Sequence, residues 1–230
     1  MAFKYRADHV GSFLRPQRLL DARERGVPAA DLKAMEDEEV LRVLQKQKDI
    51  GFKIFTDGEL RRSTFMSDFN DATAGWDNDA GVERTWAGGS GSSASSLHIS
   101  GIIKNKISQT RRLTKYELDF MKQHSPGDIK VTLPTANQFP AIGYKKEISG
   151  GTYPTYSDFL WDLVPIIRSE IQALCDEGVK YIQIDAPRYS YYIDPKWREY
   201  VKNEMGKDPD EALDEAIAVD NACLEGAKRD

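Results

Sequence analysis

The sequence predicts an α/β fold built on a parallel sheet. Short apolar runs alternate with longer segments whose apolar residues recur at helical spacing, and this alternation indicates βαβ units. The chain has 230 residues, of which 40% are hydrophobic and 30% are charged, a globular composition. Because α/β barrels form single domains of about 250 residues, we expect residues 1–230 to form one domain.

The elements follow one another in a regular order. We expect strands over residues 5–9, 53–56, 129–133 and 181–185. We expect helices over residues 32–50, 115–123, 157–178 and 210–228. Asp31 and Ser157 are the candidate N-caps of the first and third of these helices, because their short side chains can accept a hydrogen bond from the first turn. The Gly- and Ser-rich residues 88–96 predict a flexible loop.

Charge and cysteine content narrow the function classes. Lys and Arg total 32 against 37 for Asp and Glu, so the net charge of −5 argues against a general nucleic-acid binder. Two cysteines, Cys175 and Cys223, are too few for a secreted disulfide framework. The sequence has no signal-peptide pattern and no apolar run long enough to cross a membrane. We therefore expect a cytoplasmic protein with no membrane or nucleic-acid partner.

Polar residues follow three of the expected strands, where parallel α/β folds place their active sites. His9, Gly11 and Ser12 follow the first strand, Glu59 the second and Asp185 the last. Two carboxylates and a serine on a glycine turn could hold a zwitterionic ligand. Glu59 and Asp185 would then face the ligand's ammonium group, and Ser12 would donate hydrogen bonds to the ligand's carboxylate. A helix N-cap or a loop salt bridge remains the alternative role for each acidic residue, and a structural hydrogen bond remains the alternative for His9.

The other reactive side chains give no complete metal site. Neither cysteine lies near a histidine at a ligand spacing, so both are expected to be small buried hydrophobes. His124 is expected at the exposed end of a helix, whereas no partner can be named for His98. The three tyrosines of residues 189–192 either form one wall of a pocket or cover the barrel rim.

Three motifs resemble the cobalamin-independent methionine synthase family, and more narrowly the short homologues of its C-terminal catalytic domain. They are Arg6-Ala-Asp-His-Val-Gly-Ser-Phe-Leu-Arg-Pro16, Thr56-Asp-Gly-Glu-Leu-Arg-Arg62 and Tyr181-Ile-Gln-Ile-Asp-Ala-Pro187. They occur in the family's order and spread over most of the chain. The resemblance implies a TIM-type (β/α)8 barrel that transfers a methyl group from methyltetrahydrofolate to a homocysteine-like thiol, with zinc as cofactor.

The resemblance also assigns roles to matching positions. Ser12 resembles the serine that contacts the carboxylate of the amino-acid substrate, and Glu59 and Asp185 resemble the acidic pair that holds its ammonium group. Ala186 replaces the glutamate of the family's Asp-Glu-Pro. The tryptophan expected after the strand at Val131 is absent. These two departures weaken the folate assignment.

The family's zinc ligands, a His-x-Cys pair, a glutamate and a last cysteine, find no counterpart up to Asp230. By this resemblance the barrel is incomplete and its last third is missing, which leaves a homo-oligomer or a complementing chain as an expected partner. Two other functions stay open. One is alkyl transfer to another thiol on the same barrel, and the other is a truncated barrel that binds a ligand or partner without turnover.

Overall fold

The computed structural model describes residues 9–86 and 95–227, and it divides the chain into two compact units. The first unit comprises residues 1–69, 112–133 and 174–184, and the second comprises residues 70–111, 134–173 and 185–230. The expected strand at 5–9 and most of the expected loop at 88–96 lie outside the described residues.

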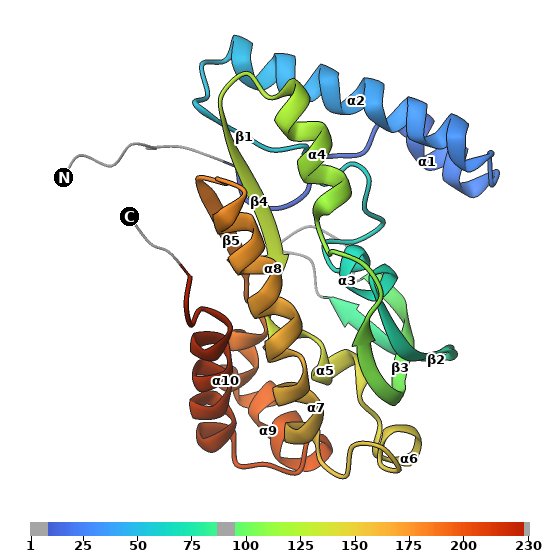
Figure 1. The fold of residues 1–230 in the computed structure, drawn as a ribbon. Helices are drawn as coiled ribbons and strands as arrows, with labels where there is room; N and C mark the ends of the chain where they lie inside the picture. The colour runs from blue at the N-terminus through green and yellow to red at the C-terminus, as the bar shows by residue number, and fades with distance from the viewer. Residues whose placement is uncertain (1–8, 87–94, 228–230) are drawn as a thin grey trace. The chain divides into compact units, whose positions relative to one another are not determined.

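The first unit contains a small sheet and the helices packed on it (Figure 1). Its strands are β1 (Ile54–Phe55), β4 (Asp128–Pro134) and β5 (Tyr181–Asp185), in the order β1-β4-β5, and only the last residues of β4 and β5, Pro134 and Asp185, belong to the second unit. β1 runs parallel to β4, with Ile54 opposite Asp128 and Phe55 opposite Ile129. The ends of β4 and β5 lie side by side, because the amide of Thr135 donates to the carbonyl of Asp185 at 3.0 Å.

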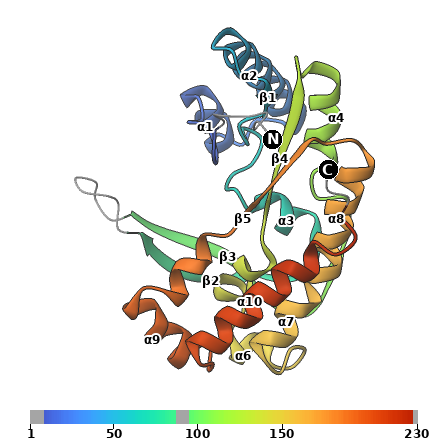
Figure 2. The same cartoon turned by 90° about the vertical axis from the view of Figure 1, so that its left-hand side faces the viewer.

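Helices α1 (Gln17–Glu24), α2 (Ala29–Asp49) and α4 (Lys115–His124) supply the rest of the first unit's core. α1 and α2 lie side by side, as Figures 1 and 2 both show. One apolar cluster joins these helices to the sheet through Leu19, Val40, Leu44, Phe55, Leu60 and Met121. The segment after β1 is therefore anchored by Leu60, whose side chain is fully buried.

The helix expected over 32–50 begins earlier than the sequence predicts. α2 starts at Ala29, its N-cap is Pro28, and Asp31 lies within the first turn. Proline is well suited to this helix start because its fixed φ suits the helix entry and it has no amide to leave unbonded. The acidic Asp31 still interacts favourably with the positive end of the helix dipole. The end at Gly51 is as expected, with a φ of +88°.

A long antiparallel hairpin opens the second unit, and the sequence did not predict it. β2 (Thr73–Trp86) and β3 (Ser95–Gln109) form the two-stranded ribbon in Figure 2, and α3 (Ser67–Asp71) precedes it. Its register shifts between Ala74 and Trp76 and again between Asp77 and Gly81. Such irregularities break the strict alternation of apolar and polar residues by which a strand is recognised.

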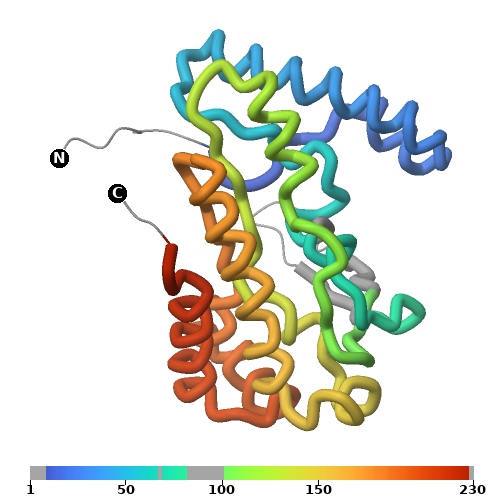
Figure 3. The backbone as a smooth tube through the Cα atoms, viewed as in Figure 1, coloured from blue at the N-terminus to red at the C-terminus, as the bar shows by residue number. Residues whose placement is uncertain are grey.

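Short helical turns and four longer helices complete the second unit, which can be followed in Figure 3. They are η1 (Ala136–Gln138), α5 (Pro140–Gly143), α6 (Lys146–Ser149), α7 (Tyr156–Asp162), α8 (Val164–Asp176), η2 (Pro187–Tyr192), α9 (Pro195–Glu204) and α10 (Pro209–Cys223). One core cluster of this unit contains Ala141, Tyr191, Tyr192, Val201, Ala212 and Ala216. The single helix expected over 157–178 is two helices, and the closing helix ends at Cys223.

The α/β class is confirmed, since β1 and β4 are parallel and lie in one sheet among helices. Within residues 9–86 and 95–227 the strands form one sheet of three strands and one of two, so a closed eight-stranded barrel stays a prediction. In the same part of the chain, none of the helices has both the length and the apolar content needed to cross a membrane.

Candidate functional site

The candidate site in the first unit is built around the tight turn that follows β1. Thr56 pairs with the Gln47 side chain of α2, donating its amide at 3.1 Å and accepting at its carbonyl at 2.8 Å. The Gln47 side chain therefore satisfies both backbone groups of Thr56 at the end of β1, as the backbone of a neighbouring strand would. Gly58 (φ +71°) and Glu59 (φ +55°) then both adopt the left-handed conformation. For Glu59 that conformation is strained, and such strain persists only where its surroundings hold it in place.

Residues 11–15 fasten this turn from the other side. The Ser12 hydroxyl donates to Oε2 of Glu59 at 2.5 Å, and the Phe13 amide donates to the Gly58 carbonyl at 3.0 Å. Arg15 donates to the Glu59 carbonyl at 3.1 Å. The structure thus brings Ser12 and Glu59 into direct contact.

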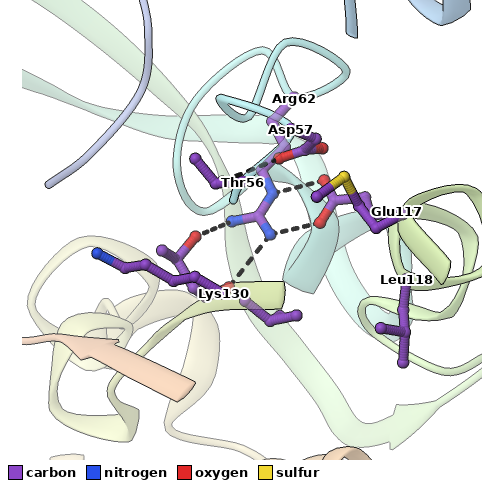
Figure 4. A pocket seen from close by; sticks show the side chains of 9 residues that line it. Thr56, Asp57, Arg62, Glu117, Leu118 and Lys130 are labelled. Atoms are coloured by element: carbon purple, nitrogen blue, oxygen red, sulfur yellow. Dashed lines mark hydrogen bonds and ion pairs between the residues drawn. The ribbon is translucent and has the colours of Figure 1, made fainter. Parts of the chain in front are cut away.

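The other carboxylate oxygen of Glu59 is held by β4. Thr132 Oγ1 donates to Glu59 Oε1 at 2.8 Å, and Arg62 in turn donates to Thr132 Oγ1 at 3.1 Å. Arg62 also binds both carboxylate oxygens of Glu117 on α4, at 2.8 and 2.6 Å (Figure 4). Glu59, Arg62, Thr132 and Glu117 are all buried. A chain of charge-assisted hydrogen bonds therefore runs from α4 through Arg62 and Thr132 to Glu59.

Asp57 lies in the same turn and has an unusual acidity. Its Oδ1 accepts from the Glu59 amide at 2.9 Å, and the residue lines a small cavity together with Arg62, Glu117 and Lys130 (Figure 4). Burial, reinforced by the negative charge of Glu117, raises the pKa of Asp57 to about 7. The carboxyl group of Asp57 therefore changes its charge near neutral pH.

His9 and Gly11 both lie close to this site. Lys130 Nζ donates to the His9 carbonyl at 2.7 Å, and the His9 ring packs edge-on against Phe13 with the ring centres 4.6 Å apart. Gly11 has a φ of +77°, which turns the backbone just before Ser12. The ring of His9 is thus a packing partner of the segment that fastens the turn.

Asp185 belongs to the second unit, where it ends β5 and is half-buried. Nearby residues of that unit carry a second polar cluster. Tyr192 donates to Asn137 Oδ1 at 2.7 Å, and Tyr189 donates to Asp220 at 2.8 Å. Burial raises the pKa of Asp220 to about 6.

Tyr191, the third of the tyrosines, has a structural role. It stacks on Trp197 with the ring centres 4.2 Å apart and lies in the second unit's core. Tyr191 is therefore a core residue, and the choice between a pocket wall and a cover of the barrel rim stays a prediction for the tyrosines of this segment. His124 ends α4 and is exposed, as expected.

Asp57, Arg62 and Thr132 were not predicted as individual site residues from the sequence. A signal was present for Thr132, because a hydroxyl side chain stands in the middle of the apolar run Val131-Thr132-Leu133. No local pattern shows that Arg62 reaches a carboxylate 55 positions later in the chain. That contact depends on the tertiary packing of α4.

The thiols and possible metal ligands do not form a site among the described residues. In residues 9–86 and 95–227, no group of three His, Cys, Asp or Glu side chains is placed to hold a metal ion. Burial raises the pKa of the Cys223 thiol to about 12, and Cys175 is half-buried rather than buried as expected. These residues do not fit the zinc centre that the resemblance implies.

Comparisons with known proteins bear on the whole chain. No family model matches it. The uncharacterised protein YxjH of Bacillus subtilis is 28% identical over 211 residues, which cover 90% of this chain and 54% of the relative. The methionine synthase of Sulfolobus acidocaldarius is 27% identical over 183 residues, which cover 77% of this chain and 50% of the relative. The chain thus spans about half the length of these curated relatives.

Solved structures give a similar result. The crystal structure of a putative vitamin-B12-independent methionine synthase from Listeria monocytogenes matches with a TM-score of 0.71 and 25% identity, covering 98% of this chain and 63% of that one. A B12-independent methionine synthase from a Shewanella species, in complex with selenomethionine, has a TM-score of 0.65 at 19% identity, which shows the fold alone.

The fold and these matches define an α/β protein whose named relatives are methionine synthases. The resemblance that the three motifs indicate is confirmed: the chain is similar to proteins named methionine synthase and to the structure of a putative vitamin-B12-independent methionine synthase.

Proposed function

We propose that the chain binds the amino-acid end of a thiol substrate and serves methyl transfer to that thiol in methionine synthesis. The observation that supports this proposal is the Glu59 carboxylate, held by the hydroxyl groups of Ser12 and Thr132 in a strained turn after β1. A charged group is fixed at this cost mainly where its exact position matters for function.

The chemistry of the turn suits an ammonium group. A carboxylate has about four lone-pair positions, and the hydroxyl groups of Ser12 and Thr132 use two of them. The remaining positions can accept hydrogen bonds from an ammonium group, and burial makes the attraction between the two charges stronger than it is in water. We assign the Ser12 backbone amide to the carboxylate of the same ligand.

Three finer parts of the function stay proposals. Asp185 is the proposed second carboxylate for the ammonium group, and methyltetrahydrofolate is the proposed methyl donor. Zinc would activate the thiol by lowering its pKa. We assign no zinc ligand to the described residues, because they contain no suitable group.

The test is a calorimetric titration of the chain with L-homocysteine and with a simple alkyl thiol. The substitution Glu59→Gln keeps the shape of the side chain and removes its charge. A charge-assisted hydrogen bond contributes about 1.5–3 kcal/mol, so we expect a loss of affinity for homocysteine of about tenfold or more. The alkyl thiol has no ammonium group, and its binding should change far less.

The matched control is Glu38→Gln, which removes one carboxylate from the exposed side of α2, where Glu38 pairs with Arg18. It should leave both titrations unchanged. Equal losses for the two thiols in the Glu59→Gln protein would mean that Glu59 only supports the turn, and the proposal would be wrong.

Alkyl transfer to another thiol is the second candidate. It is favoured by the segment after β4, where Thr135, Ala136 and Asn137 stand instead of the tryptophan of the synthases. It predicts that the unmodified chain binds the alkyl thiol more tightly than homocysteine. The same titration with Asp185→Asn shows whether Asp185 binds the ammonium group. If it does, the substitution should weaken the binding of homocysteine and leave the binding of the alkyl thiol unchanged.

A further inference from the structure

Asp57 is the buried acid that the proposed function leaves without a role. Its side chain is 6% exposed. One oxygen, Oδ1, accepts from the Glu59 amide, whereas the other, Oδ2, is buried and has no hydrogen-bond partner in the described part of the chain. A buried carboxyl oxygen without a partner is costly, so its retention at this place calls for an explanation.

The hydrogen bond from the Glu59 amide to Asp57 holds the most strained point of the turn. Glu59 is the only non-glycine residue with a positive φ among the described residues, and Gly58 before it is also left-handed. A residue with a side chain costs of the order of 1 kcal/mol or more in this conformation, whereas glycine adopts it freely, so the strain lies at Glu59. A hydrogen bond to an ionised carboxylate is about twice as strong as one to a neutral group. The restraint on Glu59 therefore depends on the charge of Asp57.

Charged groups face Asp57 from each element around it. Glu117 on α4 opposes its ionisation, whereas Arg61 and Arg62 on its own segment favour it. Arg15 from the N-terminal segment interacts with it as well, and Lys130 of β4 lines the same cavity. This balance of charges leaves Asp57 able to gain or lose its proton without the loss of a direct ion pair.

We propose that Asp57 is a positioning residue for Glu59, and that its ionisation tightens the hold of Glu59 on an ammonium ligand. The inference rests on the proposed role of Glu59 in binding that ligand. Ionised Asp57 restrains the Glu59 amide more strongly and adds a negative charge behind the binding carboxylate. By linkage, the bound ammonium group favours the ionised form of Asp57 in return.

The direction with pH follows from the acidity of Asp57. Because its pKa lies at about 7, the affinity for an ammonium ligand should rise as the pH increases through neutrality. L-methionine is the probe, since it carries the ammonium and carboxylate groups but has no thiol that titrates. We expect its affinity to increase about fivefold or more between about pH 6 and about pH 8, a range that spans this pKa.

The substitution Asp57→Asn keeps the acceptor for the Glu59 amide and removes the titration. In calorimetric titrations with L-methionine, this variant should show less than about a twofold change over the same range. Every other titratable group is common to the two proteins, so the difference between them isolates Asp57. The control Asp49→Asn removes an exposed carboxylate of α2 that accepts from Gln45, and it should keep the pH dependence of the unmodified chain. An unchanged pH dependence in the Asp57→Asn protein would overturn the inference while the proposed function stands.

A second measurement separates the two proposals and needs no ligand. The Asp57 carboxyl carbon and the Glu59 amide of the unmodified chain are followed by NMR as the pH is raised. Both resonances should titrate together with a midpoint near 7. If L-methionine binds to no form at any pH, the proposed function is wrong, and this titration alone decides the positioning role. A Glu59 amide that does not respond to Asp57 would refute that role, whether or not Asp57→Asn folds.

Discussion

At the scale of single residues, position 58 requires glycine for two separate reasons. Its φ of +71° is a conformation that residues with a side chain rarely adopt, and an added Cβ would lie 2.6 Å from Cδ2 of Phe13. The second reason matters for the site, because Phe13 and Ser12 belong to the segment that fastens Glu59. The close approach of Phe13 to the turn therefore depends on the missing side chain.

Gly58→Ala should lower the free energy of unfolding by about 2–4 kcal/mol, from backbone strain together with displacement of Phe13. Gly51→Ala is the matched control, because Gly51 also has a positive φ, of +88°, but an added Cβ there meets nothing within 4 Å. The control should cost about 1 kcal/mol from strain alone. Urea denaturation of both variants measures the difference, and equal losses would show that the Phe13 contact does not matter.

Asp57 should also affect the pH dependence of stability. Burial raises its pKa to about 7 in the folded chain, from the ordinary value of 3.8 for an aspartate in water. Between these two values the folded state keeps a proton that the unfolded state has lost, so the free energy of unfolding decreases as the pH rises from about 4 to about 7. The loss is complete above the folded-state pKa.

Asp57→Asn removes this loss. The variant should therefore be more stable than the unmodified chain at about pH 8, by at least about 1 kcal/mol, and should have no such advantage at about pH 4. Urea unfolding at a series of pH values tests this expectation. If the free energies of unfolding of the two proteins changed with pH in parallel, the raised pKa of Asp57 would be contradicted.

The contact of Ser12 with Glu59 could be anticipated from the sequence, because both residues follow expected strands and parallel strands end at one edge of a sheet. The supports of Glu59 could not be predicted in the same way. Thr132 and Arg62 act through side-chain directions and helix packing, neither of which a local pattern specifies. Asp57 was visible as part of a motif, but its acidity arises from burial and from Glu117, which only the folded chain brings near.

At the scale of elements, the ion pair of Arg62 and Glu117 joins α4 to the turn after β1. Both side chains are buried, and removal of one partner leaves the other charge uncompensated. Arg62→Met should therefore cost about 3–5 kcal/mol of stability, and Glu117→Met a similar amount. The double variant should lose less than the sum, because neither member of this pair then leaves the other buried without its partner.

The exposed pair of Lys115 and Asp119 on the same helix is the control for this cycle. Its two side chains are about half exposed, so the pair should contribute less than about 1 kcal/mol. A double-mutant cycle by urea denaturation gives both coupling energies. Additive losses at Arg62 and Glu117 would mean that the two charges are solvated independently, contrary to their burial.

The break between α7 and α8 is a feature that the spacing of apolar residues does not predict. The apolar spacing of residues 159–174 is continuous, and it correctly predicted helical structure throughout. Pro165 nevertheless divides it, because proline has no amide to donate to the carbonyl one turn before it and fits best in the first turn of a helix, here that of α8. The helix before the break is capped by Thr155, which forms a reciprocal pair of hydrogen bonds with Asp158, rather than by Ser157. Ser157 instead donates to Glu215 of α10.

At the scale of the whole molecule, the chain crosses between its two compact units five times. The alternation of strands and helices predicted the α/β class but not this division. The hairpin of β2 and β3 stands between β1 and β4 in the sequence, and its register shifts removed the period that would have identified it. Long-range assembly of this kind depends on contacts that no window of sequence contains.

The last prediction concerns metal content. The zinc centre implied by the resemblance needs ionised thiolates and histidines in a group. The described residues offer no group of three suitable side chains, and the Cys223 thiol resists ionisation because burial raises its pKa to about 12. Binding of zinc at Cys223 would have to drive off that proton and expose a core position.

We therefore expect the purified chain, after dialysis against metal-free buffer, to contain far less than one zinc ion per molecule by elemental mass spectrometry. We also expect it to transfer no methyl group to homocysteine by itself. One tightly held zinc ion per chain would contradict both expectations. Loss of that ion in Cys223→Ala, but not in Cys175→Ala, would then identify Cys223 as a ligand and require the helix that carries it to move.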